Sequence, residues 1–243
     1  MKDIPIADVR NFVLVGHTNS GKTTLLDALL YKLGVNDRLG DSASGTSMAD
    51  WSDEEKSRKI SIWAKPFDAV WRPKGGQPLR LVMLDTPGYA DFAGQVTAAT
   101  RVADAALIAV DATAGIQVGT VRAWKRCEAL GLPRAIAITG LDKENADFDG
   151  TLAALQEVWG VRCAAVTFPT DDKKGVVDVL TAQGDRAEEA RAKLTDVAAE
   201  SSDELIEKVL EGEALTAEEL AGGLRASVVQ GKFIPVFAVA AKQ

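Results

Sequence analysis

The chain has 243 residues, of which 47% are hydrophobic, and its formal net charge at pH 7 is −7. This size and composition predict one good-sized core with room for a small second module, and the negative charge argues against sequence-specific nucleic-acid binding by this domain. The single histidine, His17, excludes a zinc site built from several histidines, and the two cysteines, Cys127 and Cys163, are too few for a disulfide framework. The N-terminus lacks the apolar segment of a signal peptide and no run of 18 apolar residues occurs, so we expect a cytoplasmic protein that does not enter a membrane.

Six short apolar runs are typical of strands, and segments with helical spacing separate them. The runs cover residues 11–15, 79–84, 105–110, 134–138, 163–167 and 234–239. Because apolar strands that alternate with helices form parallel sheets covered on both faces, the sequence predicts an α/β fold. Residues 60–71 have mixed polarity and reach the run 79–84 through a loop rich in Pro and Gly, which predicts an antiparallel edge strand. We therefore expect a mixed, mostly parallel six-stranded sheet with helices on both faces.

Helical spacing of leucines is clearest at residues 22–33, which end before Gly34 as a C-terminal cap. Residues 117–130 end before Gly131 in the same way. Both helices would pack on the sheet.

Residues 168–232 do not continue the alternation of strands and helices. They are rich in Ala, Glu and Lys and contain two capping-box patterns, which begin at Ser201 and Thr216. We interpret them as an insert of about three helices, so that residues 1–167 and 233–243 form the main domain and residues 168–232 form a subdomain.

The insert concentrates negative charge. Residues 184–219 hold 12 acidic and 4 basic side chains, a net charge of −8. Such a stretch is either a solvated helical face or a binding surface for a partner, and the sequence leaves both interpretations open.

The sequence Gly-His-Thr-Asn-Ser-Gly-Lys-Thr at residues 16–23 matches the P-loop pattern, and it lies between a strand and a helix as that pattern requires. Its glycines let backbone N–H groups surround phosphates, and the helix N-terminus adds partial positive charge. We expect Lys22 to reach the β- and γ-phosphates and Thr23 to give its hydroxyl to Mg²⁺. His17 is interpreted as a loop or packing residue rather than a catalyst. The expected phosphate-binding residues are Gly16, His17, Thr18, Asn19, Ser20, Gly21, Lys22, Thr23 and Thr24.

The segment Leu-Asp-Thr-Pro-Gly-Tyr-Ala-Asp-Phe at residues 84–92 follows the P-loop by about sixty residues. Asp85 ends a predicted strand, where a carboxylate can hold Mg²⁺ through a water. Gly88 can offer its N–H to the γ-phosphate and move when that phosphate leaves. At this spacing after a P-loop, an ordinary turn is an improbable alternative.

The tetrapeptide Thr139-Gly140-Leu141-Asp142 follows the run 134–138. The carboxylate of Asp142 can accept two hydrogen bonds from guanine N1–H and N2–H₂, whereas adenine presents an acceptor at N1. Because an unpaired buried charge costs several kcal/mol, Asp142 would select guanine. The tetrapeptide alone does not exclude a surface turn.

These segments together resemble the GTPase domain of translation factors, specifically elongation factor G and its close relatives. The resemblance covers nearly the whole chain and is carried by GHTNSGKTTLL, SMADWSDEEKSRKISI, LDTPGYADF, LDKENADF, DELIEKVLEGEALTAEEL and GKFIPVFAVAAK. It implies a P-loop NTPase G domain with the helical insert of this branch, and it implies binding of GTP or GDP, Mg²⁺ and the ribosome, with a monovalent cation as a further possibility. It also implies a switch I segment in which the hydroxyl of Ser61 contacts Mg²⁺, so that the expected metal ligands are Thr23, Ser61 and Asp85.

The base site departs from the family pattern Asn-Lys-x-Asp. The family lysine, whose stem covers one face of guanine, is Gly140 here, and such a contact contributes about 0.5–2 kcal/mol. Lys242, after Ala240 and Ala241, lies where some GTPases place a lysine over the base and can partly compensate. Ala240 replaces a serine, but the backbone N–H that makes the main contact remains.

The sequence also differs from the family pattern in switch I and at the catalytic position. Ser61 replaces a threonine and Lys59 a glycine, while Tyr89 stands where the family has the histidine that positions the attacking water. A phenol is no base at neutral pH, although its oxygen can hold a water, and loss of such a group typically costs about 10²–10⁴ in rate. The expected catalytic residues are Lys22, Gly88 and Tyr89, and we expect slow hydrolysis.

Two functions therefore remain open: a GTPase that drives a ribosomal step, and a GTP-gated module that binds the ribosome or another partner with little turnover. By resemblance the acidic insert would contact the ribosomal stalk. We expect a monomer, and because the family continues into further domains we expect the 243 residues to be a piece of a longer factor.

Overall fold

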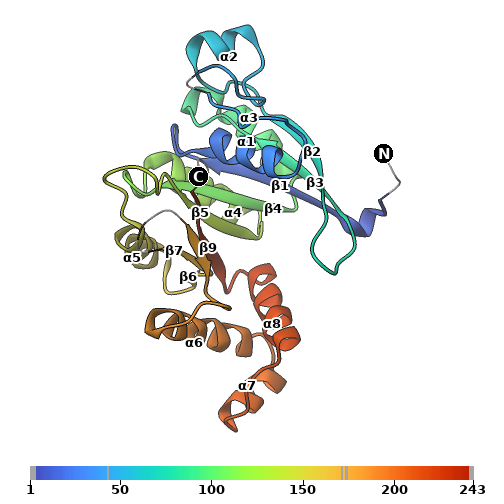
Figure 1. Cartoon of the computed structure of the whole chain (residues 1–243), viewed down its shortest axis with the longest axis vertical. Coiled ribbons are helices and arrows are strands. Elements are labelled where there is room, and N and C mark those ends of the chain that lie inside the picture. Colours follow the sequence, from blue (N-terminus) through green and yellow to red (C-terminus); the bar gives the residue numbers. More distant parts are fainter. Residues whose placement is uncertain (1–3, 43, 171, 173–174, 241–243) are drawn as a thin grey trace.

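Within residues 4–42, 44–170, 172 and 175–240, which the structure describes, a mostly parallel sheet of seven strands forms the centre (Figure 1). The structure is a computed structural model. Across the sheet the strands follow the order β2-β3-β1-β4-β5-β9-β6. Their bounds are β1 Val9–Gly16, β2 Lys65–Trp71, β3 Leu79–Asp85, β4 Ala105–Asp111, β5 Arg134–Thr139, β6 Cys163–Ala165 and β9 Ile234–Ala238.

The expected α/β fold with an antiparallel edge is confirmed, but the strand count of six is wrong. The six apolar runs form six parallel strands, and β2 adds a seventh that pairs antiparallel with β3 from Lys65↔Asp85 to Trp71↔Leu79. The mixed polarity of β2 follows from its place at the edge, where one side of the strand has no neighbour in the sheet. The run 163–167 is also divided, because its last residue begins β7, Thr167–Pro169, which pairs with β8, Val176–Asp178, in a separate two-stranded sheet.

Alternation along the strands separates two apolar layers. In β1 the side chains of Val13 and Val15 join the larger core, whereas Leu14 between them packs with Leu26 and Leu30 of α1 on the opposite face. This is the period of two that a pleated strand imposes. The helices of the main domain are α1 Lys22–Lys32, α2 Asp53–Arg58, α3 Ala93–Val102, α4 Val118–Ala129 and α5 Phe148–Trp159, and the short 3₁₀ turns are η1 Ile6–Asp8 and η2 Ala90–Phe92.

Both predicted glycine caps are present. Gly34 after α1 has φ 71° and Gly131 after α4 has φ 60°, a left-handed conformation that glycine adopts without steric cost. The helices therefore end where the sequence indicates.

The insert contains three helices in the described residues: α6 Asp185–Ala199, α7 Asp203–Leu210 and α8 Ala217–Val229. They gather at one end of the molecule, opposite α2 (Figure 1). Thr216 caps α8 with Glu219 as predicted, but α7 is capped by Ser202, which accepts from the Leu205 N–H, and not by Ser201. The Ser201 N–H still bonds to the Ala198 carbonyl, so Ser201 belongs to the turn that ends α6.

The insert shares the larger core of the sheet. Leu194 of α6 is fully buried in the same cluster as Ile136 of β5 and Ile234 of β9. No helix in the described part of the chain is both long and apolar enough to cross a membrane.

Candidate functional site

The loop between β1 and α1 has the backbone that its glycines permit. Gly16 has φ 147° and Gly21 has φ 77°. A Cβ on Gly16 would lie 2.5 Å from the Ala109 carbonyl oxygen, and one on Gly21 would lie 3.1 Å from Thr139 Oγ1. Larger residues at these two positions would push the loop away from the ends of β4 and β5. The sequence therefore fixes a tight loop at the carboxyl edge of the sheet, which is the usual ligand edge in open α/β folds.

Lys22 is buried at the start of α1, and its ammonium turns back over the loop. Its Nζ donates to the carbonyl oxygen of His17 at 2.6 Å and to that of Gly16 at 3.3 Å. Burial lowers the pKa of Lys22 to about 8, and the nearby carboxylate of Asp85 opposes this shift. An anion in the loop would offset the same desolvation, so the position favours a phosphate.

Three predicted metal ligands lie together. The Oγ1 of Thr23 is 3.1 Å from the Ser61 Oγ and donates to the Asp85 Oδ2 at 3.3 Å. Asp85 is fully buried, and burial raises its pKa to about 7, although Lys22 opposes the shift. Its Oδ1 has no hydrogen-bond partner among the described residues.

This donor set fits Mg²⁺. Two hydroxyls and one carboxylate are the hard oxygen ligands that Mg²⁺ prefers, and a cation would compensate the orphaned Asp85 oxygen. In the described residues no group of three or more His, Cys, Asp or Glu side chains could hold a metal, so any such ion would also need ligand or water oxygens. Mg²⁺ typically keeps waters and substrate phosphates in its shell.

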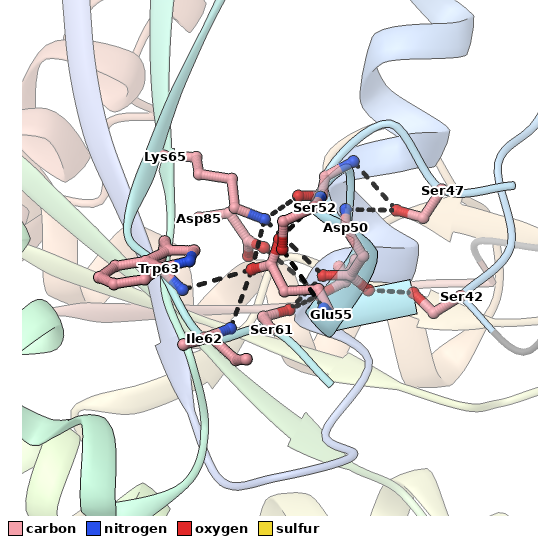
Figure 2. Close-up of polar contacts among 12 residues, drawn as sticks. Ser42, Ser47, Asp50, Ser52, Glu55, Ser61, Ile62, Trp63, Lys65 and Asp85 are labelled. Atoms are coloured by element: carbon pink, nitrogen blue, oxygen red, sulfur yellow. Dashed lines mark hydrogen bonds and ion pairs between the residues drawn. The ribbon is translucent and has the colours of Figure 1, made fainter. Parts of the chain in front are cut away.

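Ser61 belongs to the segment 44–64 before β2, the expected switch I, and buried polar contacts hold this segment in place (Figure 2). Ser61 donates to Asp50 Oδ1 at 2.8 Å, and Ser42 donates to Asp50 Oδ2 at 2.9 Å. Lys59, the residue that replaces a glycine, has φ 55° and ends α2 in a left-handed conformation. The backbone thus keeps a glycine-like geometry at that position.

Glu55 is the centre of this network. It is fully buried, pairs with Lys65 Nζ at 2.6 Å, and accepts from the Ile62 N–H at 2.9 Å and from the Ser52 hydroxyl at 2.9 Å. Burial raises the pKa of Glu55, but the hydrogen bonds from Ile62, Lys65 and Ser52 outweigh burial and bring it below the usual value. Glu55 therefore links the residue before α2 to the residues after it.

Sequence reasoning missed Asp50, Glu55 and Lys65. The pattern Ser-Asp-Glu-Glu at residues 52–55 is a capping box and could have predicted α2, because Ser52 accepts from the Glu55 N–H. No local pattern indicates the pairing of Glu55 with a lysine on the next strand.

A cleft of about 450 Å³ is lined by most of the residues predicted to bind phosphate and Mg²⁺. Thr18, Asn19, Gly21, Lys22, Thr23, Thr24, Ser61, Gly88 and Tyr89 all line it. A Cβ on Gly88 would lie 2.7 Å from the Thr18 backbone nitrogen, so Gly88 lies directly against the P-loop. Tyr89 precedes η2 and is 39% exposed.

A second cleft of about 670 Å³ adjoins the first. It too is bordered by Gly88 and Tyr89, and Arg122 and Arg126 of α4 reach it from the other side. His17 lines the larger cleft only, and its Nδ1 accepts from the Gly119 N–H at 3.2 Å. This contact gives His17 a packing role in the loop.

The residues predicted to read the base do not line the smaller cleft, but the end of β5 that carries them contacts the P-loop. Thr139 Oγ1 bonds to the Ser20 carbonyl at 2.8 Å, which ties the end of β5 to the P-loop. Gly140 follows with φ 69°, and Asp142 is exposed on the next turn. Ala240 is half-buried just after β9, whereas the predicted contacts of Ala241 and Lys242 lie outside the described residues.

Comparison with known proteins places this geometry in a family. The family model described as "Elongation factor Tu GTP binding domain" matches residues 7–243. A crystal structure of a protein from Thermus thermophilus superposes with a TM-score of 0.88 at 35% sequence identity, over 97% of this chain and 38% of that chain. The chain thus spans about two fifths of the length of that solved protein.

Proposed function

Because the chain belongs to the family of elongation factor Tu GTP-binding domains, we propose that it binds GTP and GDP with Mg²⁺ and hydrolyses GTP slowly. The observation that carries this proposal is that Lys22, Thr23 and Ser61 line one cleft at the edge of the sheet, while the buried carboxylate of Asp85 accepts from Thr23. Guanine selection rests on Asp142, which follows β5 next to the P-loop.

The P-loop and the helix N-terminus bind the phosphates. Lys22 exchanges its loop carbonyl partners for β- and γ-phosphate oxygens, and the Gly88 N–H binds the γ-phosphate. Thr23, Ser61 and Asp85 would hold Mg²⁺, and the bound ion would neutralise charge on the phosphates. A monovalent cation is a further ligand of the site that the family resemblance admits.

Tyr89 holds the attacking water through its phenol oxygen and does not act as a base. It borders the cleft beside Gly88, which supports a position near the γ-phosphate. Without a general base, the hydrolysis rate falls by about 10²–10⁴ relative to a domain that has one.

A second candidate function is a GTP-gated binding module with little turnover. Tyr89 in place of a histidine and Gly140 in place of a lysine favour it, because both departures weaken catalysis or base binding and leave the phosphate site intact. The GTPase acts with the ribosome, whereas the binding module acts with the ribosome or another partner, and each is a cytoplasmic monomer. The acidic insert is the proposed surface for the ribosomal stalk.

Single-turnover hydrolysis of GTP, with and without ribosomes, separates the two candidates. We expect slow hydrolysis that ribosomes accelerate, and no competition by ATP for the site. A rate indistinguishable from uncatalysed GTP in both conditions would favour the binding module. Equal affinity for ATP and GTP would contradict both.

A further inference from the structure

The loop after β5 has no side chain at Gly140, and the stem of Lys143 lies beside that position. A Cβ built on Gly140 would be 3.2 Å from Cε and 3.3 Å from Cδ of Lys143. The stem therefore fills the space into which a side chain at position 140 would grow.

The far end of the stem is anchored. Lys143 Nζ forms an ion pair with Asp111 Oδ2 at the end of β4. The other carboxylate oxygen of Asp111 accepts from the Thr113 N–H at 2.8 Å and the Thr113 hydroxyl at 2.6 Å. Burial raises the pKa of Asp111, but the hydrogen bonds from Lys143 and Thr113 outweigh burial and bring it below the usual value, so the anchor stays charged at neutral pH.

Lys143 is next to the predicted base-reading residue in the chain and shares its clefts with the P-loop. Lys143 directly follows Asp142 in the chain, and it lines both clefts together with Thr18 and Asn19. Its side chain is 49% exposed, so one side of the stem remains open for contact.

A base that bonds to Asp142 through its edge still exposes two apolar faces. A lysine stem offers aliphatic surface at the level of such a face, and its cation is attracted to the π-system. A side chain at position 140 would serve this purpose, but Gly140 offers none.

We propose that Lys143 covers one face of the guanine base in place of the side chain absent at Gly140, and that Asp111 fixes its stem there. This inference rests on the proposed function, since it takes the guanine nucleotide as the ligand. In this proposal, Lys143 contributes to the affinity for the base and not to phosphate binding.

The test measures binding of GDP and of inorganic triphosphate, both with Mg²⁺, by isothermal titration calorimetry. Triphosphate has no base, so it reports phosphate contacts alone. We expect Lys143→Ala to weaken GDP binding about three- to tenfold and to leave triphosphate binding within about twofold. Lys143→Met keeps an unbranched apolar stem, so we expect it to lose less GDP affinity than Lys143→Ala.

Lys125→Ala, an exposed lysine on α4, is the matched control and should change neither ligand. Circular dichroism and thermal melting identify the temperature range in which all variants are folded. The inference is overturned if Lys143→Ala leaves GDP affinity unchanged, if it weakens both ligands by the same factor, or if Lys143→Met binds GDP as weakly as Lys143→Ala. Failure of the unaltered chain to bind GDP would overturn the proposed function as well, so the two failures are distinguishable.

Discussion

At the scale of single residues, Tyr89 is the clearest difference from the family pattern, which has a histidine at this position. It borders the phosphate cleft beside Gly88, and its side chain has open space on two sides because both clefts reach it. In the proposed site, phosphate binding depends on Lys22, Gly88 and the P-loop, which do not change with the residue at position 89.

We expect Tyr89→His to raise kcat about tenfold, equivalent to about 1.4 kcal/mol of transition-state stabilisation, with KM nearly constant. A histidine ring nitrogen can align the water that a longer phenol holds less well. Single-turnover GTP hydrolysis with and without ribosomes measures this, and Tyr89→Phe controls for loss of the phenol oxygen. Flat rates for Tyr89→His in both conditions would mean that Tyr89 only packs.

Asp142 gives a second prediction at this scale. Asp142→Asn is expected to shift preference from guanine toward xanthine nucleotides, because an amide donates to a carbonyl where a carboxylate only accepts. Competition between GDP and xanthosine diphosphate for the site measures the shift, and Glu144→Gln on the same turn is the control. Unchanged preference would place the base-reading contact elsewhere.

At the scale of elements, the buried pair of Glu55 and Lys65 joins α2, in the segment expected to be switch I, to β2. The folded-state pKa of Glu55 lies below its usual value, so its ionisation stabilises the fold at pH values above the unfolded-state pKa of about 4.5. This contribution is lost as the pH falls through the folded-state pKa, that is, below 4.5.

We therefore expect the Ile62 amide, which bonds to Glu55 at 2.9 Å, to lose protection from hydrogen exchange below pH 4.5. Glu55→Gln is expected to show this loss already at pH 7, because it removes the carboxylate 2.6 Å from the buried Lys65 ammonium and leaves only that of Asp50 at 4.0 Å. Rates are corrected for the intrinsic pH dependence of exchange. Glu54→Gln, which removes only an exposed pair with Arg58, serves as control, and equal loss of protection in both variants would contradict the assignment.

The helices and strands also show which structural features can be predicted from the sequence. The parallel strands, the glycine caps and the P-loop follow from local patterns of apolar and special residues, and the structure contains all of them. The contact of Glu55 with Lys65 and that of Lys143 with Asp111 join residues of different elements or loops, and no periodicity in the sequence indicates such pairs. The sequence predicts Ser201 as the cap of α7, whereas the structure has Ser202, one residue later. Both serines are suitable caps, but Ser201 belongs to the turn that ends α6.

At the scale of the molecule, the insert and the sheet share one apolar core, and we expect them to unfold together. Leu194→Ala removes a fully buried side chain of α6, so we expect a loss of about 2–5 kcal/mol in the free energy of unfolding of the whole chain. Urea unfolding followed by tryptophan fluorescence and by circular dichroism should give coincident curves with a lowered midpoint. Two separate transitions, of which only one shifts, would show that the insert unfolds independently.

The acidic surface gives the second prediction at this scale. Reversing Glu204, Glu207 and Glu211, all exposed on or next to α7, is expected to weaken ribosome association, and added salt should weaken it in the unaltered chain. Salt should weaken the association because dissolved ions screen exposed charges over about 8 Å at physiological ionic strength. Co-sedimentation with ribosomes measures association, and GDP affinity should not change.

The matched control reverses Asp37, Asp104 and Glu157, three exposed carboxylates outside the insert. If both sets reduce co-sedimentation equally, the effect comes from total charge and not from the insert. If neither set does, the acidic face is merely solvated.

Gly88 and Tyr89 border both clefts, so this short segment is a wall shared by two adjoining spaces of about 450 and 670 Å³. In the proposed function, movement of this wall toward a bound γ-phosphate would narrow the smaller cleft and widen the larger one. The occupancy of the phosphate position would thereby change the shape of the larger cleft where Arg122 and Arg126 of α4 line it.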